Sequence, residues 1–224
     1  MVNVVVGCDE SGLGAFAGPY HVGVVATEVI PFNSAIGRYL KDSKKLSDRK
    51  RRKAVPLIQK HAAAWSVQEV TLEAIRQDMR RAWRWAIVHA FMDVQKQLGG
   101  DPRTLIVDGT VDKLLMTMLH NITVTPLRFE KGADDKYPAV MAAAILAKTA
   151  RNDAMVALAA EYPEYGWDRN AGYGTPEHIE ACRQHGVTKH HRPIRSLQGF
   201  PGYAPKEEWF EGAAASEGEA EGEA

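Results

Sequence analysis

Four acidic residues stand where their carboxylates could act together. Asp9 and Glu10 follow a short β-branched run, Asp108 follows another, and Asp134 lies in KGADDKYP, just before an alanine-rich stretch. Side chains at strand ends meet at one edge of an open α/β sheet, so these four can converge although they are distant in sequence. Converging carboxylates repel one another unless some are protonated or a hard divalent cation lies among them. The pattern favours a metal site over the alternative, in which strand-end aspartates simply cap turns.

Oxygen-only ligands at such an edge suit Mg²⁺ or Mn²⁺ far better than Zn²⁺. Asp9 and Glu10 are neighbours, and successive side chains of a regular strand point to opposite faces. We therefore expect the strand to break at Glu10. Gly12 and Gly14 supply the backbone freedom for this and would let backbone amides approach a phosphate or sugar, although a lone Gly-x-Gly more often forms a turn.

A run of basic residues is the second candidate for function. Seven bases lie within ten residues: Lys44, Lys45, Arg49, Lys50, Arg51, Arg52 and Lys53. They either face an anionic partner or form the solvated side of a helix. Ser47 is placed as the N-cap of a helix that runs toward Lys60.

The elements that position these residues can be predicted from hydrophobic periodicity. Strands are predicted at 2–8, 20–29, 64–70, 105–108 and 122–129, and helices at 71–98, 111–120 and 137–161. The first three strands have connections suited to antiparallel pairing, and the later strands alternate with helices, which favours parallel pairing. The predicted fold is α/β, a mixed five-stranded sheet flanked by helices. Trp83 and Trp85, on the longest helix, are interpreted as packing residues, and the alanines of 137–161 would let that helix lie close to the sheet.

Composition limits the class of protein. The 224 residues are 45% hydrophobic and 25% charged, which excludes disordered, collagen-like and membrane-spanning classes. Residues 206–224 hold seven acids and one base, which leaves 27 bases and 21 acids, a charge of +6, in residues 1–205. We expect 1–205 to form the catalytic domain, including a helical C-terminal part, and 206–224 to be a disordered acidic tail. Two distant cysteines and an N-terminus without a signal-peptide pattern favour the cytoplasm.

Six sequence blocks together resemble one known family. Their order and spacing resemble those of type 2 ribonuclease H (ribonuclease HII), over roughly residues 3–200. The blocks are GCDESGLGAFAGP, DSKKLS, VDG, KGADDKYPAVMAAAILAKTARND, GYGTPEH and GVTKHHR. The resemblance implies a ribonuclease-H-like fold with a helical C-terminal portion. It also implies endonucleolytic cleavage of RNA in RNA/DNA hybrids and nicking 5′ of ribonucleotides embedded in duplex DNA. We expect a monomer with these nucleic acids as partners and no membrane contact.

The resemblance also assigns roles to residues. The family's catalytic and metal-binding acids fall on Asp9, Glu10, Asp108 and Asp134, with Asp135 as the rival for the fourth. Two Mg²⁺ or Mn²⁺ ions between them would activate water and neutralise the leaving O3′, which gives 5′-phosphate and 3′-hydroxyl ends. The family places His191 in a supporting position.

Substrate contacts carry over by motif. Backbone groups of Gly12, Leu13 and Gly14 align with those that read the 2′-hydroxyl, and Tyr173 aligns with the tyrosine that packs on the ribose at a DNA–RNA junction. Phosphate-facing positions fall on Ser43, Lys44 and Lys148.

Two residues depart from the family pattern. Leu13 replaces an arginine, and Ala144 stands where a serine is usual. The loss of the arginine leaves open a hybrid-specific ribonuclease H without junction activity, similar to the type 3 enzymes. A catalytically silent nucleic-acid-binding module is the alternative from another class.

Overall fold

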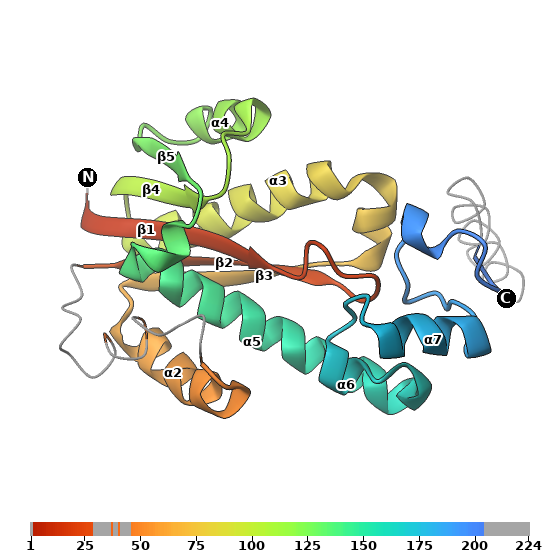
Figure 1. The fold of residues 1–224 in the computed structure, drawn as a ribbon. Coiled ribbons are helices and arrows are strands. Elements are labelled where there is room, and N and C mark those ends of the chain that lie inside the picture. Colours follow the sequence, from red (N-terminus) through yellow and green to blue (C-terminus); the bar gives the residue numbers. More distant parts are fainter. Residues whose placement is uncertain (1, 29–36, 38–39, 41–45, 204–224) are drawn as a thin grey trace, which may run out of the picture. The chain divides into compact units, whose positions relative to one another are not determined.

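The computed structural model of the chain describes residues 2–28, 37, 40 and 46–203 (Figure 1). The chain divides into two compact units. The first consists of Met1–Leu13, Pro19–Val70 and Arg80–Asp153, and the second of Gly14–Gly18, Thr71–Met79 and Ala154–Ala224. The predicted substrate contacts Ser43 and Lys44 and the acidic tail 206–224 lie outside the described residues.

A mixed five-stranded sheet forms the centre of the first unit. Its strands are β1 (Val2–Ser11), β2 (Tyr20–Thr27), β3 (Ala64–Val70), β4 (Pro102–Asp108) and β5 (Leu127–Glu130), in the spatial order β3-β2-β1-β4-β5. The β1–β2 and β2–β3 pairs are antiparallel, whereas β1–β4 and β4–β5 are parallel. The predicted fold class and pairing directions are confirmed.

The expected break of the first strand at Glu10 is wrong. Glu10 pairs with Val22 and Ser11 pairs with His21, so β1 continues to Ser11 on its antiparallel side. On the other side, the register of β1 with β4 ends at Cys8 opposite Val107. The extended backbone keeps its partner on β2 where it has lost β4, so the strand needs no break.

One face of the sheet is covered by α2 (Asp48–His61) and α5 (Pro138–Glu161), as Figure 1 shows. A hydrophobic cluster joins Val25 of β2 to Ala54 and Ile58 of α2 and to residues 141–143, 145 and 146 of α5. A Cβ on Gly7 would lie 2.2 Å from the backbone nitrogen of Val140, and one on Gly23 would lie 2.4 Å from the carbonyl oxygen of Ala143. The small residues therefore let α5 lie directly on β1 and β2, as the alanine content predicts.

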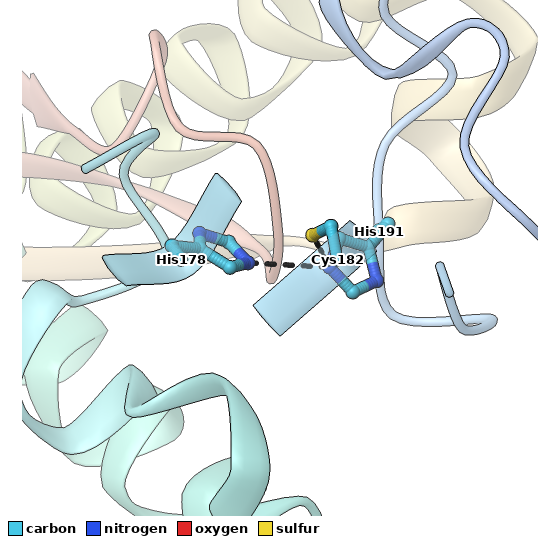
Figure 2. A group of neighbouring side chains, drawn as sticks. All are labelled: His178, Cys182 and His191. Carbon is cyan, nitrogen blue, oxygen red and sulfur yellow. Dashed lines mark hydrogen bonds between the residues drawn. The ribbon is translucent and has the colours of Figure 1, made fainter. Parts of the chain in front are cut away.

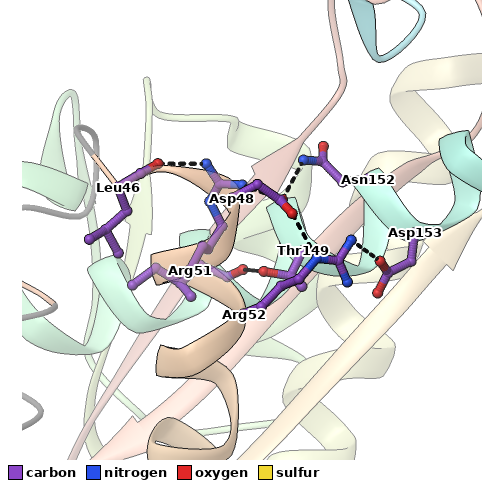
Figure 3. Close-up of polar contacts among 8 residues, drawn as sticks. Leu46, Asp48, Arg51, Arg52, Thr149, Asn152 and Asp153 are labelled. Atoms are coloured by element: carbon purple, nitrogen blue, oxygen red, sulfur yellow. Dashed lines mark hydrogen bonds and ion pairs between the residues drawn. The ribbon is translucent and has the colours of Figure 1, made fainter. Parts of the chain in front are cut away.

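Polar contacts also join α2 to α5 (Figure 3). Asp48 accepts hydrogen bonds from Arg51 at 3.1 Å, Arg52 at 2.7 Å and Asn152 at 3.2 Å. Arg52 also forms an ion pair with Asp153 at 2.6 Å. Ser47 is the N-cap residue of α2, as predicted, but its side chain makes no capping hydrogen bond. Part of the basic run is thus used to fasten α2 to α5.

The opposite face is covered by α3 (Leu72–Leu98), which is interrupted by a non-helical residue at Asp78. Arg84 of α3 donates two hydrogen bonds, each of 3.0 Å, to the carboxylate of Asp112. Asp112 is also the N-cap of α4 (Lys113–His120) and accepts from the backbone N–H of Leu115 at 2.8 Å. This pairing fixes α3 against the segment that follows β4.

The second unit has its own core. Short helices surround it: η3 (Pro163–Tyr165), α6 (Trp167–Asn170), α7 (Pro176–His185) and η4 (Arg195–Leu197). The buried residues include Tyr165, Trp167, Cys182 and Leu197. Among the described residues of the whole chain, no helix combines the length and apolar character needed to span a bilayer.

Candidate active site

The four predicted acids all belong to the first unit, near the carboxyl ends of its parallel strands. Cys8 lies opposite Val107, so Asp9 and Asp108 occupy the next positions of neighbouring strands. Asp134 lies in η2 (Ala133–Asp135), a short 3-10 helix between β5 and α5. The backbone N–H of Ala133 donates to Oδ1 of Asp108 at 2.7 Å, which ties η2 to the end of β4.

The carboxylates act on one another electrostatically. Burial, followed by the charge of Glu10 and smaller contributions from Asp108 and Asp134, raises the pKa of Asp9 to about 8. Burial, together with the charges of Asp108 and Asp134, also raises the pKa of Glu10. Asp9 is only 8% exposed. A group of carboxylates that raises the pKa of Asp9 and Glu10 is a set of oxygen donors that a hard divalent cation would stabilise in the ionised form.

The two candidates for the fourth acid differ in their surroundings. Asp134 is partly buried and raises the pKa of both Asp9 and Glu10. Asp135 is exposed. Asp134 therefore has the better environment for a shared cation.

Trp83 is a contact of the site that the sequence reasoning missed. Its indole Nε1–H donates to Oε2 of Glu10 at 3.4 Å, so it is more than the packing residue that was expected. Trp83 precedes the buried residues Ala86, Ile87 and Ala90 by three, four and seven positions, so it continues the face of α3 that covers the sheet. A tryptophan on that face, with an N–H that can donate to a carboxylate at a strand end, was the feature of the sequence that could have indicated this contact.

The glycine segment packs against a buried arginine. Gly12 has φ +96°, and a Cβ there would lie 1.8 Å from Nε of Arg151, which is itself buried. Only glycine suits this position, because both the backbone conformation and the arginine exclude a side chain. Leu13 is exposed, and Gly14, in the second unit, has no atom within 4 Å of an added Cβ.

Lys148 is the one predicted phosphate contact within the described residues. Its side chain is exposed on α5. Partial shielding from water by neighbouring groups, together with the nearby charges of Arg51 and Arg151, lowers its pKa. Lys148 is thus an exposed cation with two buried arginines nearby, an environment that favours an anion.

Two further predicted residues lie in the second unit. Tyr173 is 41% exposed, in the segment between α6 and α7. His191 is fully buried, and its Nδ1 accepts a hydrogen bond of 2.9 Å from the backbone N–H of Thr188. His191 thus has the local hydrogen-bonding role that is the simpler interpretation of this residue.

Comparison with known proteins identifies relatives over most of the chain. The family model for ribonuclease HII matches residues 6–197. Ribonuclease HII of Chlorobium luteolum is 40% identical over 193 residues, which cover 84% of this chain and 86% of the relative. The structure of ribonuclease H2 from Pyrococcus horikoshii OT3 superposes with a TM-score of 0.70 at 26% identity, covering 87% of this chain and 95% of that one.

A more distant structure shares the fold. Bst-RNase HIII in complex with Mn²⁺ has a TM-score of 0.66 at 18% identity, covering 82% of this chain and 63% of that one.

Proposed function

Because the chain belongs to the ribonuclease HII family and is a nuclease that acts on RNA/DNA, we propose that it also nicks duplex DNA 5′ of single embedded ribonucleotides. The proposed chemistry is hydrolysis assisted by two divalent cations, with 5′-phosphate and 3′-hydroxyl products. The observation that carries the proposal is that Asp108 and Asp134, from β4 and η2, raise the pKa of both Asp9 and Glu10 on β1.

The proposed ligands are Asp9, Glu10, Asp108 and Asp134. Bound Mg²⁺ or Mn²⁺ would supply activation of water and neutralisation of the leaving oxygen, as two-cation sites do in other nucleases. The protein's part is to hold the carboxylates in place before the cations arrive. The Ala133 N–H orients Asp108, and the Trp83 N–H orients Glu10. The bound Mn²⁺ of the HIII structure supports a divalent cofactor.

The chain's own groups would also bind the substrate. We assign the 2′-hydroxyl contact to the backbone of Gly12, Leu13 and Gly14, and the ribose contact to Tyr173. The exposed Lys148 supplies a cation for a phosphate, and Ser43 and Lys44 are proposed for the same role from their motif.

A nicking assay tests this function. A DNA duplex with one internal ribonucleotide, incubated with Mg²⁺, is expected to be cut on its 5′ side. The expected products carry a 3′-hydroxyl that a polymerase extends. Asp9→Asn and Asp108→Asn should each abolish turnover while the circular dichroism spectrum stays unchanged. Near-normal rates in either variant would exclude these residues as metal ligands.

One residue favours a second candidate function. Leu13 is exposed where the family pattern has an arginine, so a cation is absent from the segment proposed to read the junction. A hybrid-specific enzyme would cut within long RNA strands and leave a lone ribonucleotide uncut. The same assay with an all-RNA strand separates the two. The catalytically silent module is set aside, because the chain is a member of a hydrolytic nuclease family.

A further inference from the structure

Three buried side chains of the second unit form a cluster with the composition of a metal site. His178, Cys182 and His191 are each 0% exposed and point toward one another (Figure 2). Their nitrogen and sulfur atoms lie within 4.8 Å of one another. Nε2 of His191 is 3.2 Å from Nε2 of His178 and 3.3 Å from Sγ of Cys182. Such separations alone would suit tetrahedral Zn²⁺.

The protons of His191 argue against a metal. The backbone N–H of Thr188 can only donate, and it points at Nδ1 of His191 at 2.9 Å. Nδ1 must therefore be unprotonated, and the neutral ring carries its proton on Nε2. This proton points to His178 and Cys182. A nitrogen that carries a proton has no lone pair for a metal, so the cluster is a hydrogen-bond network.

His178 has the opposite tautomer. Its Nε2 accepts from Nε1–H of Trp167 at 3.0 Å and from His191, so its own proton lies on Nδ1. Nδ1–H then donates to the carbonyl oxygen of Tyr173 at 2.9 Å. Burial lowers the pKa of His178, and burial together with His178 lowers the pKa of His191 to about 3, so both rings are neutral near pH 7. The two histidines thus form a directed chain from Thr188 to Tyr173.

The main chain at Tyr173 is held by this network together with hydrogen bonds to neighbouring backbone groups. Its carbonyl also accepts from the N–H of Thr175 at 2.8 Å, and its N–H donates to the carbonyl of Asn170 at 3.0 Å. Glycines flank it on both sides, and a Cβ on either would overlap residues 16–17, which keeps the segment close to them. Hydrogen bonds to the backbone of Tyr173 fix the Cα from which its partly exposed ring projects.

We propose that His178, kept in its Nδ1–H tautomer by His191, is a positioning residue that fixes Tyr173 for contact with the ribose of the substrate. The inference rests on the ribose contact of Tyr173 in the proposed function. It assigns to the buried histidines a role in substrate binding at a distance, without contact to the reacting atoms.

Two amide substitutions distinguish the role of Nδ1 of His178 from that of Nε2. Asn places an N–H near the position of Nδ1, whereas Gln places its amide near Nε2. His178→Gln should raise KM for a single-ribonucleotide duplex about tenfold with kcat within about twofold, because the Tyr173 carbonyl loses a buried donor. His178→Asn should keep KM within about threefold of the wild type. Cys182→Ala, which leaves the His178–Tyr173 bond intact, is the matched control and should not change KM.

A double-mutant cycle separates this inference from the proposed function. If His178 acts through the Tyr173 ring, His178→Gln should have no further effect on KM in a Tyr173→Ala background. If Tyr173→Ala raises KM but His178→Gln does not, the positioning role is overturned and the ribose contact stands. If Tyr173→Ala leaves KM unchanged, the ribose contact fails, and the positioning role fails with it. Equal losses for Asn and Gln would also overturn it.

The tautomers can be observed without an activity measurement. Nitrogen-15 spectra of the histidine-labelled protein at pH 7 should show His178 protonated at Nδ1 and His191 protonated at Nε2. A result in which both rings carry the proton on the same nitrogen would contradict the hydrogen-bond chain from Thr188 to Tyr173. Stoichiometric Zn²⁺ binding that is lost in Cys182→Ala would overturn the network in favour of a metal site.

Discussion

The environment of Asp9 makes the stability of the metal-free protein depend on pH. Its pKa is raised from 3.8 to about 8, so between these values the folded state keeps a proton that the unfolded chain has released. Stability must then fall as pH rises through this window. A bound divalent cation favours the ionised form and offsets the loss, so the increase in Tm caused by Mg²⁺ should grow from pH 5 to pH 8. Thermal unfolding with and without Mg²⁺ measures this.

Asp9→Asn is the control for the pH experiment. The amide has no proton to release, so the metal-free Tm should vary less between pH 5 and pH 8 than in the wild type. A variant with the same slope as the wild type would show that another group carries the dependence.

Trp83 gives a second prediction at the scale of one residue. Trp83→Phe removes the donor to Glu10 and keeps most of the packing, so Glu10 should be less well oriented and should ionise less readily. We expect the Mg²⁺ concentration for half-maximal activity to rise about threefold to tenfold, from the loss of one hydrogen bond to a charged group. Calorimetry with Mn²⁺ should show the same weakening. Trp85→Phe, on the same helix and 45% exposed, is the comparison and should leave both values unchanged.

Among the elements, the contact between β2 and α5 leaves no room for added volume. A Cβ on Gly23 would lie 2.4 Å from a backbone oxygen of α5, which cannot move aside as a side chain can. Gly23→Ala should therefore lower the free energy of unfolding by about 3 kcal/mol or more, as overpacking against backbone does. Urea unfolding measures the change. Gly100→Ala, where the nearest atom is 3.7 Å away, should change it by less than about 1 kcal/mol.

The sequence predicts elements better than their ends and contacts. The β-branched runs and the apolar stripe of 71–98 are local signals, and they place all five strands and the long helix. The fifth strand begins at Leu127, later than the predicted residue 122, and the hydroxyls of Thr123 and Thr125 before it bond to Asp101 and to the carbonyl of Pro102. The interruption of α3 at Asp78 has no clear local signal in the periodicity.

In the candidate site, too, features that depend on local sequence could be predicted and contacts between distant residues could not. The acids could be found from their positions at strand ends. The indole contact to Glu10 and the guanidinium of Arg151 beneath Gly12 join residues 73 and 139 positions apart, so they depend on tertiary packing. The periodicity of α3 indicates the face on which Trp83 lies, but not the residue of another element that it contacts.

At the scale of the whole chain, charge is unevenly distributed between the body and the tail. The full sequence is neutral, while residues 1–205 carry +6. Deleting residues 206–224 should tighten binding to an RNA/DNA duplex about threefold to tenfold at low salt, and the gain should disappear at high salt through screening. Fluorescence anisotropy across a salt series measures both effects. Full-length protein with Gln in place of the seven tail glutamates should match the deletion, unless the tail acts by something other than its charge.

The parallel pairing of β1 with β4 has a consequence for biosynthesis. A ribosome makes Asp9 and Glu10 well before Asp108, which ends the neighbouring strand, and η2 follows only after β5. A nascent chain that ends before Asp108 holds two of the four proposed ligands, and one that ends between Asp108 and Asp134 holds three. We therefore expect the proposed cation site to be complete only after η2 has been made and β4 has paired with β1.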